Sequence, residues 1–259
     1  MTSQPSTPGV PTRNPAASLV GETKRRYVTG MFARIAGRYD LMNTLMTFGR
    51  DEGWRQLTVR AARPRAGGRA LDMGTGTGRI AQTLAQRGAS VWALDLTAEM
   101  MLRGRATLEE AGDSNTLRRL RFIQGDALTL PFADASFDCA TSGFTLRNVT
   151  DVRQALAELC RVVKPGGRVV TLEASQPGLW PVRLGHRAYV RVMVPLLGLL
   201  IAGDADAYSY LRSSMLSFYD APALAALMRE VGLEQVRYKH LMFGSVAVHV
   251  GTRPYPHAR

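Results

Sequence analysis

The fold of this chain is decided by Ala70-Leu-Asp-Met-Gly-Thr-Gly-Thr-Gly78, a short apolar run that ends in an acid and is then broken by alternating glycines. Glycine permits positive φ angles and lets a ligand approach the backbone closely. The residues that follow, with Ile80 and Leu84 four apart, have the apolar spacing of a helix. The stretch therefore predicts a strand that turns sharply into a helix, as in loops that bind nucleotide-type cofactors.

The spacing of the glycines argues against a dinucleotide. The dinucleotide fingerprint is Gly-x-Gly-x-x-Gly, whereas here single residues separate Gly74, Gly76 and Gly78. Asp72, just before the loop, would repel a pyrophosphate but would attract the ammonium group of an amino-acid-like ligand such as S-adenosylmethionine. The alternative for such a loop is a tight turn that binds nothing.

A second predicted strand, Ser90–Asp95, supports a cofactor site because it ends in a carboxylate about 20 residues after the glycines. Folds of this kind place a ribose-binding acid at that distance, so Asp95 is expected to accept hydrogen bonds from both ribose hydroxyls. The other role open to Asp95 is to cap the next helix. Thr97 is available for that role at the start of the predicted helix Ala98–Glu110, so the ribose role is favoured.

Composition limits the class of protein. Of the 259 residues, 46% are hydrophobic, which is enough for a substantial core. The N-terminal residues are rich in Pro, Ser and Thr and lack the apolar core of a signal peptide, so a disordered tail at 1–22 and a cytoplasmic location are expected. Cys139 and Cys160 fall in a predicted strand and a predicted helix, where buried thiols are expected, and neither a disulfide nor a metal site is predicted.

The formal net charge is +12. Such a charge favours contact with an anionic surface, either nucleic acid or phospholipid. The arginines are scattered rather than interleaved with aromatic residues in one block, so no specific nucleic-acid partner is predicted. A bias of the genome toward arginine would give the same composition.

The rest of the chain alternates predicted helices and strands, which indicates a parallel α/β fold. Apolar residues at steps of four within residues 24–62 predict two or three helices, which pack against the core and would also suit a lid over an apolar substrate. The last two strands are close enough for an antiparallel hairpin. The further predicted elements are strands at 120–124, 137–142 and 168–173, helices at 152–163 and 220–232, and hairpin strands at 234–240 and 245–251.

An insertion at about residues 177–219 contains the most apolar run of the chain, residues 190–202. Arg191 and Pro195 interrupt this run, and its uncharged part is shorter than the roughly 20 residues needed to cross a bilayer. A buried helix or helix pair is therefore expected. His186 in this insertion either faces a substrate or is simply packed, and the packed role is favoured because no histidine has the spacing of a metal site or a catalytic triad.

Several motifs give the chain a resemblance to a known family. The glycine loop, Asp95 and the turn Lys164-Pro-Gly-Gly167 occur in many methyltransferases. More specific are Tyr39-Asp40 with Asn43, the run Phe144-Thr-Leu-Arg-Asn-Val149, and Asp204-Ala-Asp206. Together, from about Tyr27 to the final hairpin, the chain resembles the ubiquinone/menaquinone-biosynthesis C-methyltransferase family. The resemblance implies an α/β, Rossmann-like methyltransferase sheet of seven strands, mostly parallel with a C-terminal antiparallel hairpin, plus N-terminal helices and a helical insertion.

We divide the chain into the tail at 1–22, an N-terminal helical lid at 23–65 and an S-adenosylmethionine-binding domain at 66–259 that includes the insertion. Where members of the family usually have asparagine and serine, this chain has Asp126 and Gly143. Asp126 can still accept a hydrogen bond from the adenine amino group, and Gly143 keeps a backbone contact. The residues expected at the cofactor are Asp72, Gly74, Thr77, Gly78, Asp95, Leu96, Asp126, Ala127 and Gly143.

The resemblance implies transfer of a methyl group from S-adenosylmethionine to a ring carbon of a reduced prenylated quinone precursor. The expected acceptor is demethylmenaquinol, and a benzoquinol of the ubiquinone route is the alternative. A methyltransferase for another small molecule and a non-catalytic S-adenosylmethionine-binding assembly subunit remain open. The chain has no Asn/Asp-Pro-Pro-Tyr motif, which speaks against methylation of a nucleic-acid base. The oligomeric state is not predicted.

A quinol ring carbon becomes nucleophilic when a conjugated hydroxyl loses its proton, so the site must support a quinolate. Arg147 is the expected fixed cation, and Asn148 and Tyr39 are the expected hydrogen-bonding groups that orient the ring or a relay water. The alternative for Arg147 is a structural ion pair with Asp40 or Asp151. Because the acceptor has a prenyl tail, peripheral, charge-assisted contact with the inner face of an anionic membrane is also predicted.

Overall fold

Seven strands form one sheet in the order β3-β2-β1-β4-β5-β7-β6. β1 to β5 are parallel, and β7 is antiparallel to both β5 and β6. This mixed sheet confirms the predicted fold class and the C-terminal antiparallel hairpin. The strands are β1 (Arg69–Met73), β2 (Ser90–Asp95), β3 (Leu120–Gln124), β4 (Phe137–Gly143), β5 (Val163–Ala174), β6 (Glu234–Leu241) and β7 (Val246–Thr252).

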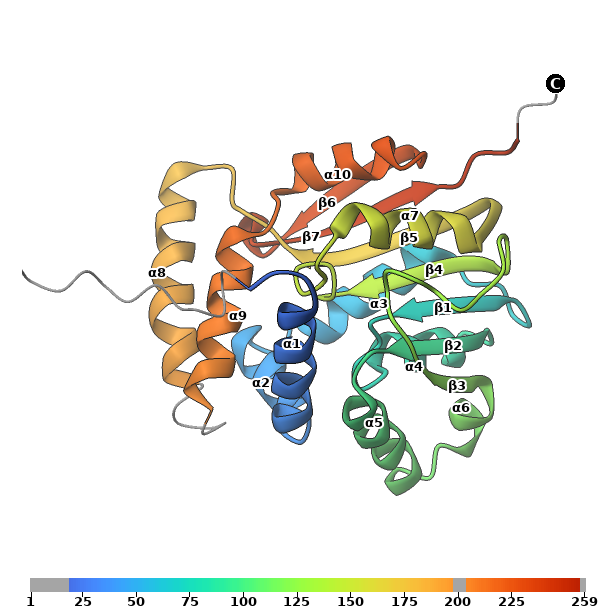
Figure 1. Cartoon of the computed structure of the whole chain (residues 1–259), viewed down its shortest axis with the longest axis horizontal. Helices are drawn as coiled ribbons and strands as arrows, with labels where there is room; N and C mark the ends of the chain where they lie inside the picture. The colour runs from blue at the N-terminus through green and yellow to red at the C-terminus, as the bar shows by residue number, and fades with distance from the viewer. Residues whose placement is uncertain (1–18, 198–203, 257–259) are drawn as a thin grey trace, which may run out of the picture.

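The computed structural model describes residues 19–197 and 204–256. The tail predicted at 1–22 lies mostly outside these residues, and so do residues 198–202 of the apolar run. Figure 1 shows α1, α2, α8 and α9 gathered at one end of the sheet, with the other helices along it. The helices are α1 (Gly21–Ile35), α2 (Tyr39–Met46), α3 (Asp51–Ala62), α4 (Arg79–Gln86), α5 (Ala98–Glu110), α6 (Ser114–Arg119), α7 (Val152–Val162), α8 (Trp180–Leu197), α9 (Ala205–Ser217) and α10 (Ala221–Glu230).

Most predicted elements are confirmed within a residue or two, and α5 has the predicted bounds. β5 differs, because it begins at Val163 and not at residue 168. The helix α7 ends at Val162, and Val163 then pairs with Phe137 before the register shifts and Cys139 pairs with Arg168. The short helix α6 was not predicted, since its six residues carry no apolar periodicity.

In the described part of the chain, the buried apolar side chains form three clusters. One fills the space between the sheet and α7 and α10, around residues such as Leu156 and Met228. A second lies between the other face of the sheet and α3 and α4, around Val59 and Leu84. The third joins α1 and α2 to α8 and α9 through Met31 and neighbouring residues. The insertion does form two helices, but they pack on the N-terminal helices, and the expectation that its apolar run is buried is wrong for Val192 and Leu196, which are exposed, whereas Val190 is buried.

The order of the strands reverses beside β1. The next strand along the chain, β2, lies on one side of β1, and β4 lies on the other side. In open α/β sheets, ligands bind at the carboxyl ends of the strands where the order reverses in this way. Among the residues that the structure describes, no helix is both long and apolar enough to span a bilayer.

Candidate active site

The glycine loop after β1 adopts the backbone conformation that its glycines predict. Gly74, Gly76 and Gly78 have φ angles of 67°, 56° and 79°. A Cβ atom on Gly74 would lie 2.2 Å from Thr145 Oγ1, so only glycine fits there. Gly78 is the residue that precedes α4, in the left-handed conformation. The loop thereby exposes its backbone at the carboxyl end of β1.

Asp95 joins this loop to the start of α5. Its Oδ2 accepts a hydrogen bond from the Gly76 amide at 2.7 Å, and its Oδ1 accepts one from the Thr97 amide at 2.9 Å. Thr97 itself makes no capping hydrogen bond through its side chain, so the expectation that Thr97 would cap α5 is wrong. Burial raises the pKa of Asp95, although the amides of Thr97 and Gly76 oppose that rise.

A first cavity of about 800 Å³ lies at the carboxyl ends of β1, β2, β3 and β4, under α1. Asp126 is at its wall, where Oδ1 accepts from the Leu128 amide at 2.9 Å and Oδ2 lies 3.4 Å from Arg25 Nε. Predicted site residues that line this cavity are Gly74, Asp95, Leu96, Asp126, Ala127, Gly143, Tyr39 and Asn148.

A smaller space of about 390 Å³ adjoins the glycine loop and is lined by Asp72 and Thr77, among others. Asp72 is almost fully buried and accepts hydrogen bonds from Thr75 Oγ1 and Thr141 Oγ1, both at 2.7 Å. Burial raises the pKa of Asp72 to about 6, despite these bonds. Thr77 Oγ1 donates to Asp40 Oδ1 at 2.8 Å and so links the loop to α2.

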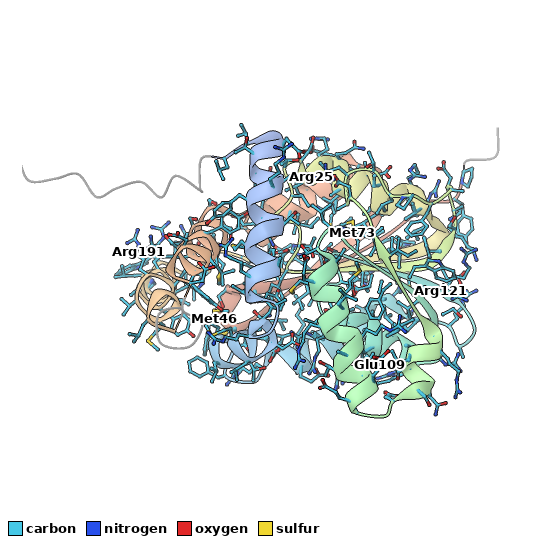
Figure 2. All side chains as sticks on the ribbon, turned by 60° about the horizontal axis from the view of Figure 1, so that its bottom comes forward. Arg25, Met46, Met73, Glu109, Arg121 and Arg191 are labelled. Atoms are coloured by element: carbon cyan, nitrogen blue, oxygen red, sulfur yellow. The ribbon has the colours of Figure 1, made fainter. Side chains whose placement is uncertain are left out.

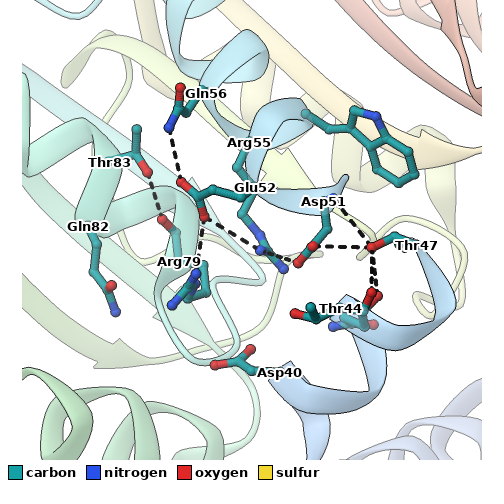
Figure 3. Close-up of polar contacts among 12 residues, drawn as sticks. Asp40, Thr44, Thr47, Asp51, Glu52, Arg55, Gln56, Arg79, Gln82 and Thr83 are labelled. Atoms are coloured by element: carbon teal, nitrogen blue, oxygen red, sulfur yellow. Dashed lines mark hydrogen bonds and ion pairs between the residues drawn. The ribbon is translucent and has the colours of Figure 1, made fainter. Parts of the chain in front are cut away.

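Two arginines that were not predicted as site residues, Arg55 and Arg79, also line the smaller space. Figure 3 shows both held by acids of α3. Arg55 is buried and pairs with Asp51 at 2.5 Å, and Arg79 Nη2 lies 3.1 Å from Glu52 Oε2. The space therefore has two acids, Asp40 and Asp72, and two guanidinium groups at its walls.

A second cavity of about 660 Å³ lies beyond Phe144, between α2, α3, α8 and α9 and the ends of β5 and β7. Phe144 lines the first cavity, the second cavity and the smaller space, and its own φ is 57°. The second cavity has mainly apolar walls, including Met46, Trp54 and Met215. It is thus an apolar compartment that shares one aromatic wall with the first cavity.

Arg147 is the charged group of the second cavity. It is buried, and its Nη1 lies 2.9 Å from Oε2 of the fully buried Glu173. Burial raises the pKa of Glu173, and the charge of Arg147 opposes that rise. Neither suggested partner pairs with Arg147, since Asp40 accepts from Thr77 and Asp151 caps α7 through the Gln154 amide. The ion pair exists, but with a different acid.

The three residues predicted to be catalytic do not share one cavity. Arg147 lines the second cavity, whereas Asn148 and Tyr39 line the first. Asn148 Nδ2 donates to the Phe144 carbonyl at 3.1 Å. Burial raises the pKa of the Tyr39 hydroxyl, which keeps it protonated. The three residues therefore line two cavities that share Phe144 as a wall.

Sequence reasoning did not predict Gly104 or the position of Phe144, and it left His186 open between a substrate-facing and a packed role. A Cβ on Gly104 would lie 2.1 Å from the Thr77 carbonyl oxygen, so this glycine lets α5 pack against the loop. His186, for which a packed role was favoured, lines the second cavity. No local pattern indicates these contacts, because each depends on segments that are far apart in the sequence.

Comparison with known proteins gives the following similarities. The model of the ubiE/COQ5 methyltransferase family matches residues 20–253. The chain is 44% identical over 235 residues to demethylmenaquinone methyltransferase of Roseiflexus castenholzii, covering 90% of this chain and 95% of that protein. It is 41% identical over 236 residues to ubiquinone/menaquinone biosynthesis C-methyltransferase UbiE of Dinoroseobacter shibae, covering 89% and 92%. A SAM-dependent methyltransferase structure from Aquifex aeolicus has the same fold, with a TM-score of 0.55 and 17% identity over 82% of this chain and 96% of that one.

Proposed function

Because the chain belongs to the ubiE/COQ5 methyltransferase family and is an S-adenosylmethionine-dependent methyltransferase, we propose that it methylates a ring carbon of demethylmenaquinol. The single observation that carries this proposal is the apolar second cavity, which adjoins the first cavity at Phe144. A flat aromatic ring with an apolar tail matches such walls. The benzoquinol of the ubiquinone route is the second candidate, because one similar protein is named for both pathways.

The residues of the first cavity and the smaller space fit the cofactor. The glycine loop has no Cβ where the ligand would approach, and the strand ends carry three acids. We assign Asp95 to the ribose hydroxyls, Asp126 to the adenine amino group and Asp72 to the ammonium group. Arg55 and Arg79 would bind the carboxylate of the methionine end. S-adenosylmethionine supplies a methyl group on a positively charged sulfur.

Arg147 is suited to hold the oxygen of the acceptor. Its Nε is buried and has no hydrogen-bond partner among the described residues, and its guanidinium carbon lies 5.1 Å from the centre of the Phe144 ring. Glu173 fixes the other end of the guanidinium, so the free N–H has a defined direction. We propose that this N–H donates to the quinolate oxygen, and that Asn148 and Tyr39 orient the ring or a relay water from the cofactor side.

Turnover with defined acceptors tests the proposed function. Purified protein is incubated with S-adenosylmethionine and either demethylmenaquinol or 2-polyprenyl-6-methoxy-1,4-benzoquinol, and the quinones are analysed by mass spectrometry. We expect a product one methyl heavier from demethylmenaquinol. Faster turnover of the benzoquinol would select the second candidate, and no turnover of either quinol by protein that binds the cofactor would refute both.

A pair of variants tests the assignment of the second cavity. Met215→Trp adds bulk to its wall, whereas Leu102→Trp adds the same ring to the exposed surface of α5, at a residue that lines neither cavity. We expect the first variant to lose quinol turnover with unchanged cofactor affinity, because the ring no longer fits. The second variant should keep both. Equal turnover of the two variants would mean that the acceptor binds elsewhere.

We also propose peripheral contact with an anionic membrane through the outer surface of α8. This helix contains no acidic residue and carries three exposed arginines, Arg183, Arg187 and Arg191. Large apolar side chains are exposed beside them, among them Trp180 and Leu184. Apolar residues combined with basic ones favour an anionic lipid surface. The same helix forms a wall of the second cavity, so a prenyl tail would have a short path from the bilayer.

A further inference from the structure

The proposed reaction needs a group that removes a proton from the ring hydroxyl, and Arg147 is not that group. An arginine keeps its proton in proteins, and here Arg147 is also paired with Glu173. The pair has no net charge, so it stabilises a quinolate less than a lone cation would. A separate proton acceptor is therefore required at the wall of the second cavity.

The walls of this cavity offer few ionisable groups. Those lining it among the described residues are Arg147, His186 and Tyr189. Tyr189 is excluded as a base at neutral pH, because burial raises the pKa of its hydroxyl and that hydroxyl donates to the Met46 carbonyl at 2.9 Å. The lining side chains from α2, α3, α9, β5 and β7 carry no ionisable group.

His186 has the properties of a base. Its Nδ1 is buried and has no hydrogen-bond partner within the described part of the chain. His186, Tyr189 and Val190 line the cavity from positions that share one face of α8. Burial lowers the pKa of His186, and the charge of Arg187 on the same helix lowers it further, so the imidazole is neutral at pH 7. A neutral imidazole has a lone pair that can accept a proton.

We propose that His186 is the general base of the methyl transfer and accepts the proton of the acceptor hydroxyl, a role that rests on the proposed function. The O–H bond breaks, and its proton moves to the imidazole while Arg147 holds the oxygen. The ring carbon forms a bond to the methyl group as the carbon–sulfur bond breaks, and its electron pair stays on sulfur to give S-adenosylhomocysteine. The ring carbon then loses its own hydrogen, the oxygen regains a proton from His186, and one proton leaves to solvent.

The test compares His186→Gln with the wild-type protein across pH. General-base catalysis contributes typically 10²–10⁴-fold, so we expect kcat with demethylmenaquinol to fall by about 10²-fold or more at pH 7. The wild-type kcat should stay level down to pH values below the usual histidine pKa, because the pKa of His186 is lowered. The variant should instead gain rate steadily as pH rises, since its acceptor must be deprotonated by solvent.

Three controls separate this role from a structural one. Cofactor affinity by calorimetry should match the wild type in His186→Gln. His186→Ala should regain activity when imidazole is added, which a packing defect would not allow. His240→Gln, which changes an exposed histidine on β6, should keep the wild-type rate and pH profile.

The outcomes distinguish this inference from the proposed function. Wild-type protein that methylates demethylmenaquinol, together with a His186→Gln variant within about threefold of its kcat and with the same pH profile, would overturn the role of His186 alone. Wild-type protein that binds the cofactor but methylates neither quinol would overturn the proposed function and this inference with it.

Discussion

The first and second cavities are built in different ways. The first lies at the ends of four neighbouring parallel strands, and its polar contacts come largely from backbone amides and from acids at strand ends. The second is assembled from α2, α3, α8, α9 and the ends of β5 and β7, and its walls are mainly apolar side chains. The difference is consistent with our proposal that the sheet itself supplies the cofactor site and the added helices supply the acceptor site.

The largest effect on methylation is expected from a change at Arg147, which lines the second cavity together with the shared residue Phe144. Arg147→Ala should reduce methylation by about 10³-fold, because the quinolate loses its charged hydrogen-bond donor. It should also lower the free energy of unfolding by about 3–5 kcal/mol, since Glu173 would stay buried without its partner. Cofactor affinity, which depends on the first cavity, should change little. Turnover, urea unfolding and calorimetry measure the three quantities.

The double variant Arg147→Met with Glu173→Leu is the control for stability. Replacing both members of a buried ion pair with apolar residues often leaves stability unchanged, so the free energy of unfolding of the double variant should be close to that of the wild type. Methylation should not return. Recovery of methylation in the double variant, or equal loss of cofactor affinity and activity in the single one, would mean that Arg147 is only structural.

The same contrast explains what the sequence could predict. The glycine loop, Asp95 and Asp126 are local features of strand ends, and the structure brings them to one cavity. Arg147, in the loop after β4, was predicted to be important, but its partner was not, because Glu173 lies 26 residues away on β5. His186 had no pattern at all, since its place depends on how α8 packs against α2 and α9. Long-range packing is the part that periodicity and spacing do not encode.

A second, smaller effect is expected in the pH dependence of cofactor binding at the first cavity and the smaller space beside it. The folded-state pKa of Asp72 is about 6, above its usual 3.8. The cofactor's ammonium group favours the ionised carboxylate, so binding below pH 6 must expel a proton. We expect affinity for S-adenosylmethionine to rise about tenfold between pH 5 and pH 7, about fivefold of it by pH 6, and then to level off. Calorimetry at several pH values measures this, and quinol binding should show no such step.

Asp72→Asn is the matched variant for this prediction. It should weaken cofactor binding and remove the step near pH 6, because no proton is released. The pH dependence of the free energy of unfolding tests the titration of Asp72 independently. The folded state holds its proton more tightly than the unfolded one, so wild-type stability should fall as pH rises from about 4 to about 6, and this fall should be smaller in the variant. A step that persists in Asp72→Asn would assign the titration to another group.

The smallest expected effect concerns how each ligand reaches its cavity. Figure 2 shows Arg191 at the outer edge of α8, at the opposite end of the molecule from Arg121. A basic residue near an anionic surface contributes about 1 kcal/mol, so Arg191→Ala should weaken binding to anionic vesicles about fivefold. Arg121→Ala removes the same charge from the exposed edge of β3 and should leave vesicle binding nearly unchanged.

Arg191→Ala should change the kinetics of the acceptor, which we assign to the second cavity, and not those of the cofactor. In Arg191→Ala, KM for demethylmenaquinol carried in vesicles should rise by a few-fold if, as we propose, the acceptor enters from the bilayer side of α8. The affinity for S-adenosylmethionine should stay the same, since that ligand comes from water to the other cavity. The difference between the two variants should shrink at high salt, which screens the surface charge. Equal vesicle binding of both variants at low salt would show that α8 is not the membrane contact.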